Sequence, residues 1–193
     1  MLAEQRGVAK TFRALYYLDL ARFYDPLYAE STERSSYMTD LQAVEGLTVP
    51  IIDENATEEI ARNNPRQPRE EMFQFIFNDL NDAEKGLANY KPTAKNLPSL
   101  AVVYGLKARA YLWLGQFDEG YKNVKTGMEA YQEAAKYARL AITESGATIM
   151  TEGEWLNPTS GFNKANNAWL WYLPQTAEGI TNLVNYIDRK SVV

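Results

Sequence analysis

The chain has 193 residues, a mass of 21.9 kDa and a formal net charge of −5, which is the size of one ordinary domain with one hydrophobic core. Its composition, 46% apolar and 23% charged, is typical of a folded globular protein. Cys and His are both absent, which excludes disulfides, thiol nucleophiles, Cys or His zinc sites, haem held by His and Ser-His-Asp triads. The excess of 25 acidic over 20 basic residues argues against nucleic-acid binding.

The charge pattern also bears on membrane insertion. The longest run without a charge is the 13 residues from Ala165 to Ala177, shorter than the ~20 that a spanning helix needs, so no transmembrane segment is predicted. Charged residues occur throughout the first twenty positions, which leaves no signal-peptide apolar region. We therefore expect either that the protein is cytoplasmic or that this chain is a piece that lacks the true start of its protein.

The first predicted helix covers residues 2–23. Its apolar positions follow the three- and four-residue spacing of a helix, and it ends at Asp25-Pro26 because proline cannot continue a helix. Residues 24–67 show no sustained period, and between Asp25 and Glu59 Arg34 is the only basic residue among many acidic ones. We expect a long acidic insertion loop over 24–67, a length typical of functional or disordered segments.

The middle of the chain carries clear helix boundaries. Pro68 suits a first helical position, Gly115 suits the end of a helix, and Asp118 is a natural N-cap for the next one. The helix after Asp118 has the most regular apolar stripe in the chain, and Gly127 inside it allows a local kink. The predicted helices are residues 68–89, 98–115 and 118–146.

Beyond residue 146 the pattern weakens. A loop rich in Asn, Gly, Pro, Thr and Ser covers residues 151–167, and the aromatic run at 169–172 is interpreted as a short extended segment that ends at Pro174. A weak helical pattern returns between Ile180 and Ile187.

Residues 108–127 (ARAYLWLGQFDEGYKNVKTG) have the layout of a tetratricopeptide unit. Small Ala108 and a tight turn at Gly115 are followed by small Gly120 in the expected second helix. Two antiparallel helices joined by a tight turn need small residues where their axes come closest. The predicted fold class is therefore all-α, with tetratricopeptide-like helical pairs and long inserted loops, in a single domain over residues 1–193.

Four sequence motifs follow one another along the chain. They are residues 12–20 (FRALYYLDL) with 22–24 and 26–27, residues 69–76 (REEMFQFI) with 79–80 and 83–84, residues 108–115 (ARAYLWLG), and residues 137–142 (YARLAI) with 144–146. Together they cover about residues 6–146 and resemble the SusD/RagB-like nutrient-binding lipoproteins of Gram-negative outer membranes. Residues 166–171 (NNAWLW) also resemble a motif of that family, with Ala168 in place of its acidic residue.

This resemblance implies a function. It implies non-catalytic binding of a polysaccharide or oligosaccharide at the bacterial cell surface, for import through a TonB-dependent outer-membrane transporter. It implies no catalysis. No catalytic residue, no cofactor and no metal-ligand residue is predicted for this chain. Members of that family are longer and carry a lipobox Cys near their start, so the resemblance also implies that this chain is an internal fragment of a surface-exposed outer-membrane lipoprotein.

The candidate glycan contacts come from composition rather than from a fixed motif. A glycan surface needs aromatic faces for the C–H groups of sugar rings, with amide or carboxylate groups nearby for the hydroxyls. Burial in the core is the competing interpretation for every aromatic residue concerned. The candidates are Trp155, Asn157, Trp169, Trp171 and Tyr172, with Asn166 and Asn167 beside them, and Tyr37 in the acidic loop, where Tyr24 and Tyr28 are similar.

Other functions stay open. A glycoside hydrolase needs two carboxylates about 5 to 9.5 Å apart, and with 25 acidic residues such pairs arise by chance. A tetratricopeptide-type peptide scaffold could bind a peptide carboxylate through Lys107 and Arg109 on one helix and Arg6, Lys10 and Arg13 on another. Two helix pairs are, however, fewer than the three repeats that a stable stack needs. A partial calcium loop at Asp53, Asn55 and Glu58 lacks the glycine expected at the sixth position.

Overall fold

A computed structural model describes residues 2–25, 44–157, 159 and 165–172, and the predicted all-α fold class is confirmed. In this part of the chain the secondary structure is helical, apart from one isolated bridge between Leu47 and Pro68. None of these helices is both long enough and apolar enough to cross a bilayer. The helices are α1 (Leu2–Tyr24), α2 (Glu58–Arg62), α3 (Arg69–Leu87), α4 (Leu100–Leu114), α5 (Gly127–Ser145) and α6 (Glu152–Trp155).

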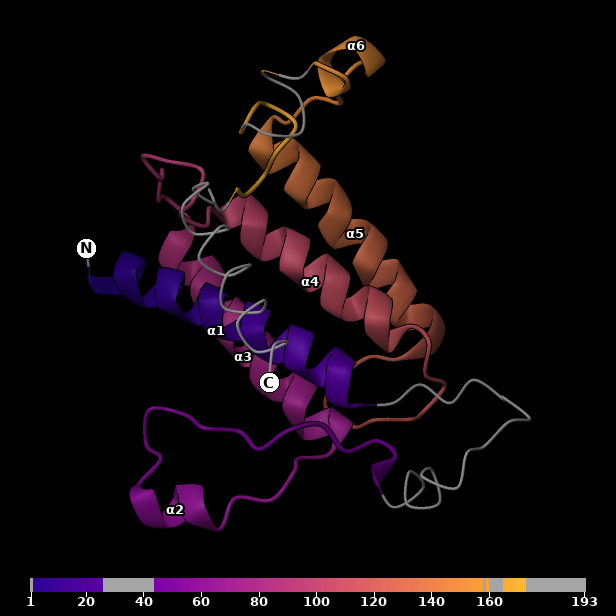
Figure 1. The fold of residues 1–193 in the computed structure, drawn as a ribbon. Coiled ribbons are helices and arrows are strands. Elements are labelled where there is room, and N and C mark those ends of the chain that lie inside the picture. Colours follow the sequence, from indigo (N-terminus) through magenta and orange to yellow (C-terminus); the bar gives the residue numbers. More distant parts are fainter. Residues whose placement is uncertain (1, 26–43, 158, 160–164, 173–193) are drawn as a thin grey trace, which may run out of the picture.

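The four long helices form two antiparallel pairs, as Figure 1 shows. α1 packs against α3, α4 packs against α5, and α3 also contacts α4, so the two pairs share one core. Leu18, Phe73, Ile76 and Val103 are completely buried in that core, and burial of side chains of this size stabilises a fold by roughly 1.5–3 kcal/mol each. The predicted helical pairs are thus confirmed, and α2 and its flanking loops lie outside them (Figure 1).

The start of α5 corrects the sequence prediction. The helix begins at Gly127 rather than at Asp118, and residues 118–126 form an irregular loop, which also contains Gly120. Gly127 adopts φ +55°, a conformation that favours glycine, so it marks the start of the helix rather than a kink inside it. Val124 misled the prediction because it is buried in the core from the loop.

Glycines allow the helices of each pair to approach closely. A Cβ on Gly86 of α3 would lie 2.6 Å from the backbone carbonyl oxygen of Ala3 in α1. A Cβ on Gly115, at the end of α4, would lie 2.4 Å from the ring of Tyr131 in α5. The φ of Gly115 is −61°, so this contact with Tyr131, rather than a left-handed cap, requires the glycine.

Ion pairs fix the register of α1 against α3. Arg13 donates two hydrogen bonds to Asp79, of 2.6 and 2.7 Å, and a third of 2.7 Å to Glu54 in the loop before α2. Lys10 contacts Asp79 at 3.3 Å and Asp82 at 2.6 Å. Arg13 therefore ties the described part of the expected 24–67 loop to the helical core.

We predict that Gly86→Ala destabilises the fold by about 1–3 kcal/mol, because its Cβ would force α3 away from the backbone of α1. Urea unfolding followed by circular dichroism measures the change. Gly153→Ala in α6 is the matched control, because it also adds a methyl group to a helix but meets no atom within 4 Å. Equal stability of the two variants would contradict the close approach of α1 and α3.

We predict an acid-sensitive contribution from Glu54, whose pKa is lowered to about 2, chiefly by the hydrogen bond from Arg13. Because this pKa lies below the ordinary value of 4.5, the Arg13–Glu54 ion pair stabilises the fold fully above pH 4.5. Its contribution is lost as the pH falls toward 2. Glu54 is half exposed, so we expect the contribution to be about 0.2–1 kcal/mol.

The free energy of unfolding of wild type and Glu54→Gln, measured between pH 7 and pH 2.5, tests this contribution. The difference between the two proteins should shrink as the pH falls. Glu59→Gln is the control, since Glu59 forms no ion pair with a described residue. A difference that stays constant with pH would count against the Arg13–Glu54 pair.

Candidate functional site

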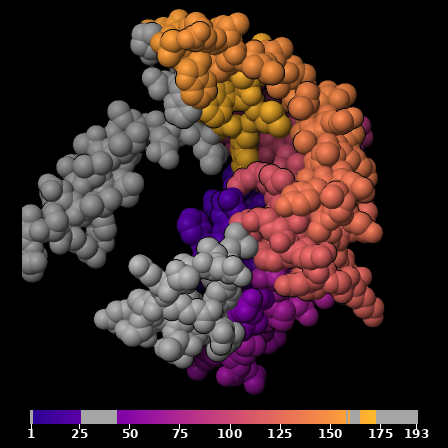
Figure 2. Space-filling view, turned by 90° about the vertical axis from the view of Figure 1, so that its right-hand side faces the viewer, coloured from indigo at the N-terminus to yellow at the C-terminus, as the bar shows by residue number. Residues whose placement is uncertain are grey.

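The segment 165–172 lies at the end of the bundle where α4 begins and α5 ends. Figure 2 shows these residues, in yellow, directly against the orange part of the chain that precedes them. Leu170 lies over Gly105 of α4, with its Cδ2 3.8 Å from where a Cβ would be. Trp171 packs edge-on against Phe12 of α1, with 5.0 Å between ring centroids. The helices thus provide the floor on which this segment rests.

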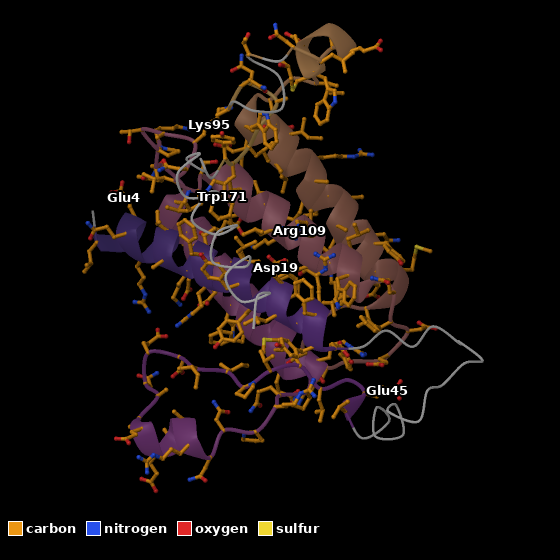
Figure 3. All side chains as sticks on the ribbon, in the orientation of Figure 1. Glu4, Asp19, Glu45, Lys95, Arg109 and Trp171 are labelled. Atoms are coloured by element: carbon orange, nitrogen blue, oxygen red, sulfur yellow. The ribbon has the colours of Figure 1, made fainter. Side chains whose placement is uncertain are left out.

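Lys95, in the loop between α3 and α4, holds the segment in place. Its ammonium donates hydrogen bonds to the carbonyl oxygens of Asn166 and Trp169, the latter at 2.7 Å. Its own carbonyl accepts the N–H of Tyr172 at 2.9 Å, and the Trp171 indole donates to the Asn96 carbonyl at 3.1 Å. Figure 3 shows Lys95 and Trp171 near the first turn of α4.

Two cavities flank this segment. The first, about 330 Å³, lies between residues 148–150, Glu154 of α6 and residues 166–168. The second, about 370 Å³, lies between the loop after α3, the end of α5 and residues 167–170. Asn167 lines both cavities, and its exposed side-chain amide makes no hydrogen bond to another described residue. The amide can therefore serve a ligand in either cavity.

Each cavity has a carboxylate. Glu154 belongs to a capping box with Thr151, and hydrogen bonds from the backbone N–H and then the hydroxyl of Thr151 lower the pKa of Glu154. Glu144 forms an ion pair with Lys91 at 3.7 Å beside the second cavity. Ionised carboxylates accept hydrogen bonds and can therefore bind hydroxyl groups.

The structure separates the candidate residues into three groups. Trp169 lines the second cavity and packs edge-on against Tyr172, at 6.0 Å between ring centroids. Trp171, in contrast, packs on the core. Trp155 is half exposed on α6, and Asn157 bonds to Thr159; neither lines these two cavities.

Of the remaining candidates, Asn166 forms side-chain contacts within the fold, and two tyrosines lie outside the described residues. Asn166 uses its side chain within the fold: its oxygen accepts the N–H of Ala168 at 2.9 Å, and its nitrogen contacts the Met150 sulfur at 3.4 Å. Tyr37 and Tyr28 lie outside the described residues. Among the described residues no group of three acidic side chains could hold a metal ion.

The cations considered for peptide binding are engaged elsewhere. Lys107 is buried, with a hydrogen bond to Asn81 at 2.7 Å and an ion pair with Glu84. Arg109 of α4 faces Asp19 of α1, at 3.2 Å (Figure 3). Lys107 is therefore wrong as a receptor for a peptide carboxylate.

Lys95 and Glu154 were missed from the sequence. Lys95 lies in a short linker, and its partners are 71 and 74 residues away in the chain, so no local pattern could indicate it. The capping-box spacing of Thr151 and Glu154 was a usable signal for α6.

Solved structures share this fold. A SusD-like carbohydrate-binding protein from Bacteroides vulgatus matches 97% of this chain with a TM-score of 0.66 and 24% sequence identity. A SusD-like protein from Bacteroides fragilis matches 93% of it, with a TM-score of 0.59 and 18% identity. The chain has the SusD-like fold.

The match covers only part of each of these two structures. The chain spans 35% of the length of the Bacteroides vulgatus protein and 29% of that of the Bacteroides fragilis protein. No family model and no curated protein matches the sequence. The SusD-like fold therefore rests on the three-dimensional comparison.

We predict that Trp171 and Trp155 differ in their effect on stability. Trp171→Ala removes the contact with Phe12 and the bond to Asn96, which should cost about 2 kcal/mol or more. Trp155→Ala, at a half-exposed position on a short helix, should change stability by less than about 1 kcal/mol. Chemical unfolding measures both, and the reverse order would refute the assignment of Trp171 to the core.

Proposed function

We propose that this chain binds a glycan without catalysis, in the two cavities on either side of Asn167. The observation that carries the proposal is the likeness of the fold to a SusD-like carbohydrate-binding protein, combined with the residues that line the cavities. Because the identity is low and the coverage partial, the ligand is inferred from the chemistry of the site as well.

The cavities offer the groups that sugars require. The Trp169 indole provides an apolar surface for a sugar ring, and the Asn167 amide provides both a donor and an acceptor for hydroxyl groups. Glu154 adds a carboxylate acceptor in the first cavity. A cavity of about 330 or 370 Å³ lies within the usual range for small ligands.

We propose a biological setting from the sequence resemblance. In that setting residues 1–193 are one tetratricopeptide-like domain of a longer RagB-type lipoprotein at the outer-membrane surface, and the bound polysaccharide or oligosaccharide passes to a TonB-dependent transporter for nutrient uptake. The fraction of each SusD-like neighbour that the chain spans is compatible with a longer protein.

A glycan array tests the proposal. We expect wild type to bind at least one class of oligosaccharide, and Asn167→Ala and Trp169→Ala to weaken that binding at least tenfold, or about 1.4 kcal/mol. Asn123→Ala is the matched control, because Asn123 is exposed in the distant loop before α5. Isothermal titration measures the affinities, and circular dichroism checks that each variant is folded.

Parallel assays address the competing functions. Binding to a peptide array with no binding to glycans would favour a peptide scaffold. Turnover of a chromogenic glycoside that is abolished by Glu154→Gln or Glu144→Gln would show an enzyme. Unchanged glycan affinity in Asn167→Ala would place the ligand elsewhere on the chain.

A further inference from the structure

We infer that Lys95 is the positioning residue of this site: its ammonium, bound to the carbonyl oxygens of Asn166 and Trp169, sets the geometry of the two glycan cavities. The inference rests on the proposed function.

The positions of the two carbonyl groups carry the argument. Asn166 belongs to the wall of the first cavity and Trp169 to the wall of the second, while Asn167 between them lines both. Residues 166–169 thus form a wall that the two cavities share, and the Lys95 ammonium binds both ends of this wall. A shift of this wall would move the Asn167 amide and the Trp169 ring together.

The ammonium of Lys95 acts at the turn of the segment, between residues 166 and 169. The segment lies outside the helices, and within it the Asn166 carbonyl also accepts the Trp169 N–H at 3.2 Å, so this carbonyl receives donors from both sides of the bend. An ammonium supplies three donors, and its hydrogen bonds are strengthened by charge. No apolar side chain at position 95 could satisfy these carbonyl oxygens.

Lys122 offers a matched control outside the site. It is exposed in the loop before α5 and lines neither of the two cavities. Lys95 is half-buried, and its ammonium faces backbone carbonyls. Removal of the charge at either position lowers the net charge equally, so the pair of variants separates positioning from general electrostatics.

The test compares Lys95→Met, Lys95→Arg and Lys122→Met in the 193-residue chain. We expect Lys95→Met to weaken glycan binding at least tenfold and to speed hydrogen exchange of the Trp169 and Tyr172 amides at least tenfold without ligand, with the thermal midpoint close to that of wild type. Lys95→Arg should restore most of both properties, and Lys122→Met should change neither.

Each other outcome has a definite meaning. Weaker binding in Lys95→Met with unchanged amide exchange would overturn the inference, because Lys95 would then contact the ligand without positioning the wall. Unchanged binding with faster exchange would overturn it as well. If wild type binds no glycan, the proposed function fails, and the exchange measurement alone still shows whether Lys95 holds the wall.

Discussion

The arrangement of the two helix pairs depends on the ion pairs of Arg69. Its buried guanidinium binds both carboxylate oxygens of Asp25 at the end of α1, at 2.5 and 3.0 Å, and it reaches Glu119 at 2.8 Å. It also lies 3.6 Å from the ring centroid of Phe117. A buried charge is costly unless it is fully paired. The end of α1, the start of α3 and the loop that joins α4 to α5 must therefore meet at this one point.

The site lies at the other end of α4 and is organised in a similar way. There Lys95 gathers backbone carbonyls, whereas Arg69 gathers carboxylates. The difference suits the locations: a guanidinium forms a planar, bidentate pair in a dry core, and a flexible ammonium reaches carbonyl groups that point in different directions. The helices fix the frame, and most residues that line the two cavities belong to the loops that connect or follow the helices.

Sequence patterns predicted the helices well where the apolar face and the caps agree. α1, α3 and α4 begin and end close to the expected residues, since proline or a capping residue marks their boundaries. The predicted start of α5 was wrong because Tyr121 continues the helical spacing although it lies in an irregular loop. From that loop its hydroxyl accepts a hydrogen bond from Arg69 of α3. Spacing shows that a residue is buried, and it does not show which backbone conformation brings it there.

The site was harder to predict for a related reason. Trp169 and Trp171 are the same residue type two positions apart, yet Trp169 lines a cavity and Trp171 packs against Phe12. The Trp169 carbonyl accepts a hydrogen bond from Lys95, and the Trp171 indole donates one to the Asn96 carbonyl. Composition indicated a segment whose residues 166–170 line the two cavities. The different positions of its side chains depend on contacts with residues more than seventy positions away in sequence. An aromatic run next to asparagines therefore does not show by itself which ring lines a cavity, because that depends on the backbone carbonyls of the run and on the distant cation that binds them.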